Sequence, residues 1–394
     1  MIPERMELGV FMAPFHLVSE NPTLALRRNL ELISWLDYLG YDEVWVGEHH
    51  SGGWETIASP EMFLAAAGER TQRIRLGTGV VSIPYHHPFN VADRIVLLDH
   101  LTRGRAMLGV GPGALQGDAS YFGIESTRQR DMMDEGLGVI IRLLTGDEPV
   151  THQGEWFELH EAQLQLKPFQ RPTMPIAVAS TISPAGMTCA GKHGVGILSV
   201  ASYSQEGLTA VQTQWGYAEE AAQEAGQPPP DRRNWRLVVP FHLSESREQA
   251  IEDISDGIMR WNNDYLVGTL GAPNRKPVES GRRLAEAMNE FGGAIVGTPD
   301  DAIECIRRLQ QLAGGFGCLL GLAHEWTTQE KIYHSYELMA RYVMPEFQDA
   351  TTWLKRSEGW TQANREKLMG ATIAAITKAI QDRGASHAPD GQSG

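Results

Sequence analysis

The sequence of 394 residues predicts a (β/α)8 barrel, and we expect residues 1–394 to form a single domain of this class. Eight short apolar segments alternate with segments of helical periodicity, which is typical of parallel strands joined by crossover helices. Glycine, histidine and hydroxyl residues follow several of these strands, at the end where barrels carry their sites. An open, doubly wound sheet would leave the last strand–helix units unexplained.

The expected strands are short runs rich in β-branched and apolar residues. They cover residues 6–13, 41–47, 74–82, 105–110, 175–179, 196–199, 235–243 and 314–322. The helices are marked by N-cap residues followed by proline, as in Asn21-Pro22 and Ser59-Pro60, and Thr298 with Asp301 predicts a capping box. They cover residues 22–39, 60–70, 90–101, 129–144, 183–192, 204–224, 246–265, a stretch from 299, and 329–344.

Three segments depart from this alternation. Residues 148–169 alternate in polarity around Gln153-Gly154, so we expect a β-hairpin. Residues 266–291 are rich in Gly, Pro, Arg and Glu and predict a long loop, which we expect to act as a lid over the C-terminal mouth of the barrel. Residues 346–394 predict an extension that is helical over 361–383, packs on the barrel or on a second subunit, and frays from 385 onward.

The composition limits the partners of the chain. The formal net charge of −15, from 49 acidic and 34 basic residues, disfavours nucleic acid and anionic membranes and favours a small ligand. Cys189, Cys305 and Cys318 form no CxxC pair, so neither a disulfide framework nor a zinc ribbon is expected. The chain lacks a signal peptide and a long apolar span, and we expect a cytoplasmic protein.

Two pairs of histidines follow neighbouring strands and are the first candidates for chemistry. His49 and His50 follow the strand at 41–47, and His86 and His87 follow the strand at 74–82. Histidine is a common metal ligand, but no HxH or HExxH spacing is present, so we expect no metal site here. His50, His86 and His87 have a structural alternative, hydrogen bonds to loop carbonyls. Glu48 either orients the imidazole of His49 or is buried in an ion pair.

A glycine-rich run at residues 109–113 follows the fourth expected strand. It has the form GxGxG, whereas a dinucleotide-binding loop needs GxGxxG at the first strand–helix turn. We therefore exclude a nicotinamide site of that kind. The glycines, Gly111 among them, would instead give a flat ligand access to the mouth of the barrel.

These motifs together resemble the bacterial luciferase-like flavin monooxygenases over nearly the whole chain. The matching stretches are GEHH at 47–50, LGTGV at 76–80, HP at 87–88, LD at 98–99 and VGTP at 296–299. The resemblance implies a two-component enzyme that receives reduced flavin, FMN or FAD, from a separate NAD(P)H–flavin reductase. It further implies that the reduced flavin reacts with O2 and forms a C4a-(hydro)peroxide in a pocket that excludes water. We also expect the protein to be a homodimer.

The resemblance also assigns roles to particular residues. His49 falls on the catalytic histidine, and Gly79-Val80 falls on the segment beside the isoalloxazine, which often contains a non-proline cis peptide bond. Ser180 and Ser183 match hydroxyl residues that lie at the flavin phosphate in the family. Pro112 stands where luciferase has an arginine that binds this phosphate, so the resemblance does not decide whether the flavin is FMN or FAD. Asp118 matches an acidic residue near the flavin; its alternative is a solvated loop carboxylate. The expected substrate pocket consists of Phe15, His16, Trp54, His324 and Trp326, which follow strands in the sequence.

A narrower likeness concerns the substrate. Residues 14–16, 21–24, 47–60, 84–88 and 109–115 resemble members of the family that oxygenate limonene, so we expect a small apolar substrate such as a monoterpene alkene. Two alternatives stay open. One is a deazaflavin (F420)-dependent oxidoreductase of the same fold, which would transfer hydride without oxygen. The other is a flavin-binding protein without catalysis, which should lack a histidine at position 49.

Overall fold

The computed structural model describes residues 5–13, 15–200, 202–272 and 275–385. The chain divides into two compact units, Met1–Gln348 and Asp349–Gly394. The first unit contains all the strands that follow, and the second consists of helices.

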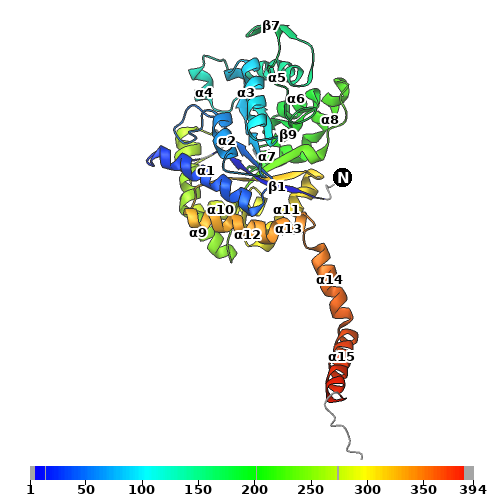
Figure 1. Ribbon diagram of the computed structural model, residues 1–394. Helices are drawn as coiled ribbons and strands as arrows, with labels where there is room; N and C mark the ends of the chain where they lie inside the picture. Colours follow the sequence, from blue (N-terminus) through cyan, green and yellow to red (C-terminus); the bar gives the residue numbers. More distant parts are fainter. Residues whose placement is uncertain (1–4, 14, 201, 273–274, 386–394) are drawn as a thin grey trace, which may run out of the picture. The chain divides into compact units, whose positions relative to one another are not determined.

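Eight parallel strands close into a barrel in the first unit (Figure 1). They are β1 (Glu7–Met12), β2 (Glu43–Val46), β3 (Arg75–Thr78), β5 (Ala106–Gly111), β8 (Ile176–Ser180), β9 (Gly196–Ser199), β10 (Trp235–Leu243) and β12 (Cys318–Leu322). Each strand pairs in parallel with the next, and β1 pairs with β12, where Glu7 lies opposite Cys318. The predicted (β/α)8 barrel is therefore confirmed.

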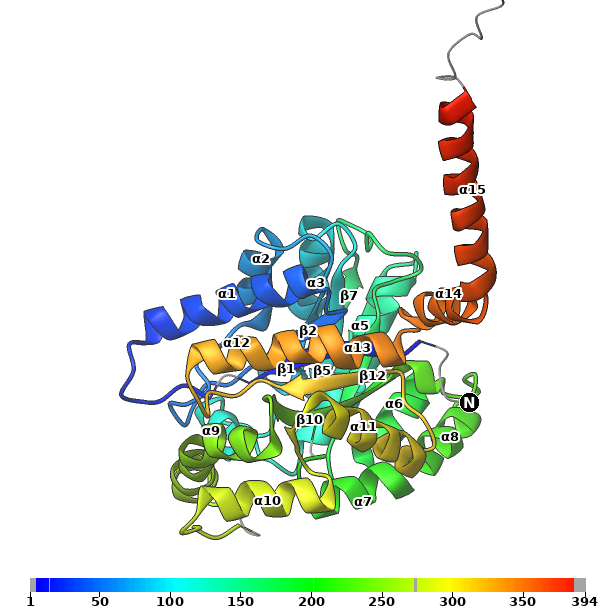
Figure 2. The same cartoon turned by 90° about the horizontal axis from the view of Figure 1, so that it is seen from below.

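Helices cover the outside of the barrel (Figure 2). They are α1 (Pro22–Leu39), α2 (Pro60–Gly68), α3 (Pro88–Leu101), α5 (Gln129–Thr145), α6 (Ala185–His193), α7 (Gln205–Thr213), α8 (Trp215–Glu224), α9 (Arg247–Arg260), α11 (Pro299–Ala313) and α12 (Gln329–Leu338). The predicted caps are confirmed: Asn21 accepts hydrogen bonds from Thr23 and Leu24, and Thr298 and Asp301 form a capping box.

The interior of the barrel is filled by a tryptophan. Trp45 on β2 is fully buried among Met107, Leu198, Val238 and other apolar side chains. A Cβ atom at Gly77 would lie 2.6 Å from Cε3 of Trp45, which no real contact tolerates. The glycines of the third strand were expected to mark the close approach of a ligand or of backbone. At Gly77 the group that approaches is this indole.

A buried carboxylate supports the opposite, N-terminal end of the barrel. Glu43 accepts hydrogen bonds from Nε of Arg236 at 2.7 Å and from Nε1 of Trp45 at 2.6 Å, and it also pairs with Arg75 at 2.5 Å. Burial alone would raise the pKa of Glu43, but the guanidinium groups of Arg236 and Arg75 outweigh it and lower the pKa to about 2. The charge therefore ties β2 to β3 and β10.

The segment at 266–291 differs from the expected loop. A π-helix covers Trp261–Thr269, and the helix α10 covers Gly281–Phe291, capped by Ser280 and by Gly292 with φ of 85°. The expectation of a continuous loop is wrong because Ala285 and Met288 form one apolar helical face that packs beside α9. The charged residues on the other face gave the segment its polar composition.

The remaining elements are short or lie near the C-terminus. The hairpin β6 (Val150–Gln153) and β7 (Glu158–Ala162) is confirmed. The strand expected at 74–82 is divided into β3 and β4 (Val81–Ser82). Sequence analysis missed α4 (Gln116–Tyr121) and β11 (Ile295–Gly297), which are too short to show a period. A π-helix (Met339–Val343) and α13 (Met344–Phe347) follow α12, and the second unit contains α14 (Thr352–Ala363) and α15 (Arg365–Ala385). None of the helices in the described ranges is long and apolar enough to cross a membrane.

Candidate active site

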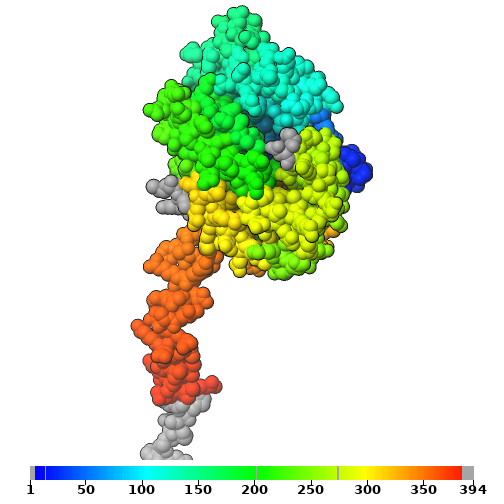
Figure 3. Space-filling view, turned by 180° about the vertical axis from the view of Figure 1, so that it is seen from behind, coloured from blue at the N-terminus to red at the C-terminus, as the bar shows by residue number. Residues whose placement is uncertain are grey.

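The candidate site lies where the strands end at the C-terminal mouth of the barrel. In Figure 3 the surface is hollowed between the segments coloured cyan, green and yellow-green. His49 follows β2 by three residues, and Val80 and Gly111 lie at the corresponding ends of β3 and β5. Parallel strands thus bring to one edge residues that are far apart in the sequence.

Two carboxylates hold the two ring nitrogens of His49. Nδ1 lies 3.1 Å from Oδ2 of Asp118, and Nε2 lies 3.1 Å from Oε2 of Glu55. The side chain of His49 is 15% exposed, whereas those of Asp118 and Glu55 are 1% and 6% exposed. The contact of Nδ1 with Asp118 is a hydrogen bond, whereas Oε2 of Glu55 makes no hydrogen bond within the described residues and meets Nε2 only as a charge contact. Two carboxylates at this distance favour the positively charged form of the imidazole.

The pKa of His49 responds to two opposing effects. Burial lowers it, but the charge of Glu55 and the hydrogen bond to Asp118 outweigh burial, so that the pKa lies above its ordinary value of 6.5. The pKa of Asp118 moves the other way: burial raises it, and the contacts with His49 and Ser51 lower it below its usual value. The two carboxylates therefore favour the protonated form of His49.

Asp118 lies on the short helix α4 and contacts the loop after β2. Besides His49, it accepts hydrogen bonds from the backbone N–H of His50 at 3.1 Å and from the hydroxyl of Ser51 at 2.5 Å. The alternative of a solvated loop carboxylate is wrong, because α4 buries this side chain against residues 49–51. Its oxygens face donors from residues 49–51.

Glu48 serves a different network from its neighbour. Its side chain is fully buried, and it lies 2.8 Å from Nε2 of His50 and 2.7 Å from Nε2 of His86. It also accepts a hydrogen bond from the backbone N–H of Ser82 at 2.8 Å. Glu48 therefore contacts His50 and His86 rather than the imidazole of His49, since neighbouring residues of an extended chain point to opposite sides.

The other histidines of the two pairs are structural. His50 and His86 both contact the carboxylate of Glu48, whereas the structural alternative had named loop carbonyls as their partners. His87 accepts a hydrogen bond from the backbone N–H of Phe89 and caps α3. Among the described residues, these histidines do not belong to any group of three metal-ligating side chains.

Apart from Asp118 on α4, the residues expected around a flavin lie at or just beyond the C-terminal ends of β3, β5 and β8. The peptide bond between Gly79 and Val80 is cis, as the resemblance implied. A Cβ atom at Gly111 would lie 2.6 Å from Cγ2 of Val80, so Gly111 makes room for that side chain. Ser180 ends β8, and its buried hydroxyl lacks a hydrogen-bond partner within the described ranges, while Ser183 is half-buried just before α6.

The five residues expected in the substrate pocket fall into two groups. Phe15, His324 and Trp326 line one pocket of about 550 Å³, together with charged residues such as Arg28 and Asp253. His324 is stacked on Trp326 with ring centroids 4.3 Å apart, and burial lowers its pKa to about 3. This imidazole is neutral at physiological pH.

His16 and Trp54 do not line that pocket. His16 is held by Asn29 at 2.7 Å and Thr56 at 3.1 Å, and burial lowers its pKa to about 4. Trp54 donates its indole N–H to Thr269 at 3.2 Å and packs against Tyr265. Both side chains are thus fixed by neighbouring segments.

Sequence analysis missed Glu55 and Tyr265. The hydroxyl of Tyr265 donates to Glu55, so the carboxylate that faces His49 is shared with the π-helix at Trp261–Thr269. Burial and then Glu55 raise the pKa of Tyr265 well above its ordinary value. The only signal for Glu55 was an acidic residue in an otherwise apolar and small stretch after the histidine pair.

Comparison with known proteins places this geometry in a family. The luciferase-like monooxygenase family matches residues 6–314. Over 361 residues, 91% of this chain and 96% of the relative, the chain is 47% identical to 4-hydroxyprotoasukamycin monooxygenase of Streptomyces nodosus subsp. asukaensis. It is 44% identical to limonene 1,2-monooxygenase of Rhodococcus erythropolis, over 96% of this chain and 95% of the relative.

A solved structure agrees with these relatives. The oxygenating constituent of 3,6-diketocamphane monooxygenase from Pseudomonas putida, in complex with FMN, superimposes with a TM-score of 0.72 at 25% identity. The match covers 86% of this chain and 98% of the other. The extent of the sequence match and the shared barrel lead to one conclusion: the chain belongs to the luciferase-like monooxygenase family.

Proposed function

We propose that the chain is the oxygenase component of a two-component monooxygenase. It would receive reduced flavin from a separate NAD(P)H–flavin reductase and insert one atom of O2 into a small apolar substrate. Our first choice of reaction is the epoxidation of a monoterpene alkene such as limonene. The observation that carries the proposal is the imidazole of His49, held at the mouth of the barrel between Asp118 and Glu55.

The residues on β3, β5 and β8 fit a flavin. A buried hydroxyl without a partner costs free energy, and the phosphate of a flavin would supply the missing hydrogen bond to Ser180. Ser183 lies just before α6, where the first backbone N–H groups of the helix favour an anion. When bound, reduced flavin supplies the electrons that activate O2. The FMN in the diketocamphane enzyme supports FMN as the form used here.

The proposed task of His49 is to hold and release a proton. Its raised pKa favours the imidazolium form, which can act as a general acid. Release of the proton from Nε2 requires an acceptor that competes with Glu55, which is itself partly occupied by Tyr265. Asp118 holds Nδ1 and so fixes the plane of the ring during that transfer.

The apolar surroundings of the mouth support a water-poor reaction. Trp54, Trp261, Tyr265 and Trp326 are each less than a tenth exposed and pack together with Phe15. Exclusion of water protects an activated oxygen species from wasteful loss as hydrogen peroxide. Aromatic walls also favour a substrate that buries hydrocarbon surface.

The test uses the purified full chain, any flavin reductase that supplies reduced flavin, and 18O2. Limonene and 4-hydroxyprotoasukamycin, the compounds in the names of the two relatives, would be offered in parallel with a ketone. We expect one 18O atom in the organic product of an alkene. Formation of hydrogen peroxide alone across all substrates would overturn the proposal. Turnover with reduced deazaflavin in the absence of O2 would instead support the hydride-transfer alternative.

A further inference from the structure

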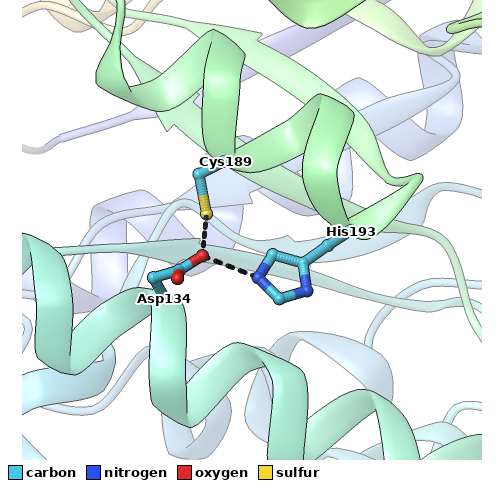
Figure 4. Close-up of side chains that lie close together, drawn as sticks. All are labelled: Asp134, Cys189 and His193. Atoms are coloured by element: carbon cyan, nitrogen blue, oxygen red, sulfur yellow. Dashed lines mark hydrogen bonds and ion pairs between the residues drawn. The ribbon is translucent and has the colours of Figure 1, made fainter. Parts of the chain in front are cut away.

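A mixed cluster of ligand-type side chains lies between two barrel helices, on the outer wall. Asp134 comes from α5, and Cys189 and His193 come from α6 (Figure 4). Cys189 and His193 are four residues apart, so they project from the same face of the helix toward the carboxylate. Asp134, Cys189 and His193 are not among the residues of the candidate active site described above.

The three ligand atoms converge on a small volume. Sγ of Cys189 lies 3.7 Å and Nε2 of His193 lies 2.8 Å from Oδ1 of Asp134. All three atoms lie within 4.8 Å of one another. In a tetrahedral zinc site with bonds of about 2.0–2.3 Å, ligand atoms are separated by roughly 3.3–3.7 Å. The sulfur–oxygen separation already agrees, and the nitrogen–oxygen separation needs to widen by only about half an ångström.

We propose that Asp134, Cys189 and His193 bind one Zn²⁺ ion, with water as the fourth ligand. A thiolate, an imidazole and a carboxylate form a donor set that zinc accepts. On binding, the thiol of Cys189 loses its proton to solvent, and His193 coordinates through Nε2 in its neutral form. The ion would join α5 to α6 across the β6–β7 hairpin, which lies between them in the sequence.

A second cluster shows by contrast why this one is suited to a metal. Glu7, Glu43 and Cys318 also converge, but Arg75 and Arg236 already occupy the carboxylates there. In the Asp134 cluster, as far as the structure describes the chain, the cation in contact is Lys192. Its Nζ lies 2.5 Å from Oδ2 of Asp134, whereas Cys189 and His193 contact Oδ1. The side chain of Lys192 is 53% exposed, so it can move into solvent at little cost.

The site is accessible to an ion and yet ordered. The side chains of His193 and Asp134 are 13% and 32% exposed, and Cys189 is buried. A metal can therefore enter from the side of Asp134 while the sulfur stays shielded. Gly138, on α5, leaves space for the imidazole: a Cβ atom there would lie 3.3 Å from Cε1 of His193.

The experiment titrates the metal-stripped full chain with Zn²⁺ by calorimetry and, separately, with Co²⁺ as a spectroscopic substitute. We expect one ion per chain, a thiolate-to-cobalt charge-transfer absorption, and a melting temperature that rises with Zn²⁺ concentration. Loss of one ligand in Cys189→Ser or His193→Gln should weaken Zn²⁺ binding more than about 100-fold, since even changes outside the ligand shell cost 10–100-fold. Cys305→Ser and His160→Gln are the matched controls, because they remove a buried cysteine on α11 and an exposed histidine on β7.

Any of the following results would overturn the proposal. One is wild-type protein that gives no charge-transfer absorption with Co²⁺, a result that does not depend on any variant folding. Another is Zn²⁺ binding of unchanged affinity in folded Cys189→Ser, and a third is a loss in Cys305→Ser equal to that in Cys189→Ser. None of these measurements involves flavin or turnover, so their outcome is independent of the proposed monooxygenase function.

Discussion

At the residue scale, Glu48, His49 and His50, which follow β2 closely, belong to two separate networks of contacts. His49 faces Asp118 and Glu55, whereas Glu48 and His50 on either side bind each other. Alternation along an extended chain produces this division, since neighbouring side chains point to opposite sides. A substitution at position 49 should therefore affect proton transfer without disturbing the network that joins the loops after β2 and β3.

Replacement of His49 by alanine tests this separation. We expect the variant to keep its fold and most of its flavin affinity but to lose product formation by about 10²–10⁴-fold, the usual contribution of a general acid or base. Product yield per reduced flavin consumed is the measurement, and circular dichroism checks the fold. His160→Ala, at an exposed position of the hairpin, serves as the control. Full product yield in His49→Ala would exclude the proton-transfer role.

The replacement of Asp118 by asparagine should change the pH dependence. Asp118 is one of the groups that raise the pKa of His49, so its loss lowers that pKa, and the imidazolium gives up its proton at lower pH. The alkaline limb of product formation should move to lower pH by about one unit or more. Asp131→Asn, on the exposed side of α5, should leave the limb in place. An unshifted limb in Asp118→Asn would mean that this carboxylate does not control His49.

Sequence reasoning reached the site only in part at this scale. His49 and Asp118 were named as site residues, and the structure brings them into contact. Glu55 and Tyr265 were missed because their contact joins positions 210 residues apart, across a π-helix that no local pattern announces. His16 and Trp54 were also named for the pocket; hydrogen bonds hold them to Asn29 and Thr269, and their part in substrate binding stays a prediction.

At the scale of elements, the segment from the π-helix to α10 carries the lid prediction. Its residues Tyr265 and Thr269 contact Glu55 and Trp54 in the loop after β2, which supports a position over the mouth. We expect trypsin to cleave the chain after Arg275. Bound flavin should slow this cleavage about tenfold or more, because binding raises the free energy needed to open the segment. Cleavage at Lys355 in α14 is the internal control and should not respond to flavin. Equal protection at both sites, or at neither, would contradict the lid.

The buried carboxylate of Glu43 supplies a prediction for β2 and its neighbours. Glu43→Gln should lower the free energy of unfolding at pH 7 by about 3–5 kcal/mol, because it leaves buried guanidinium charge without its partner. The pKa of Glu43 is lowered in the folded state, so its contribution is present above the unfolded pKa near 4.5 and fades as pH falls toward about 2. The difference from wild type in urea unfolding should shrink accordingly in acid.

Glu7→Gln is the matched control for that measurement. Burial and the nearby charge of Glu43 raise the pKa of Glu7 to about 7, so the folded protein binds more protons at this position than the unfolded chain between pH 4.5 and 7. Ionised Glu7 therefore destabilises the fold as pH rises, and its removal should cost little at pH 7. A loss in Glu7→Gln as large as that in Glu43→Gln would contradict the account.

The elements that sequence analysis found and missed differ in their length and in their partners. α1 and α11 were placed correctly because capping residues mark their ends. α4 has six residues, which is less than two helical turns, and β11 has three residues, which is too short to show the alternation of side chains along a strand. α10 was taken for a loop because its composition of Gly281 and many charged residues was weighed, and the helical spacing of Leu284, Ala285, Met288 and Phe291 was overlooked.

At the scale of the whole molecule, the second unit carries the prediction of a homodimer. Met369, Ile373, Ile376 and Ile380 on α15 are exposed and recur at alternating spacings of four and three residues. This spacing is that of a coiled-coil seam, so a second copy of the helix is the partner we expect. The double variant Ile373→Glu, Ile376→Glu should halve the mass measured by light scattering, whereas Lys378→Glu should not. An unchanged mass in the double variant would exclude α15 as the interface.

The fold of the whole barrel could be predicted because strand and helix segments alternate regularly along the sequence. Eight strand segments of similar length recur between Glu7 and Leu322, and only a closed ring leaves none of them with an unpaired edge. The contacts that close the ring could not be specified, since the register between β1 and β12 depends on residues at opposite ends of the barrel unit. The fold class predicted the position of His49 at the mouth of the barrel. It did not predict that Asp118 and Glu55 contact the two ring nitrogens of His49.

The pairing of β1 with β12 has a consequence for the synthesis of the protein. Glu7 lies opposite Cys318, and at about 5–20 residues per second a ribosome needs roughly 15–60 s to make the chain between them. During that time the outer edge of β1 has its final neighbour on one side only, and its backbone groups are open to other nascent chains. The barrel is therefore completed only after its last strand has left the exit tunnel, and protease protection of β1 in stalled nascent chains should begin only once Leu322 has emerged.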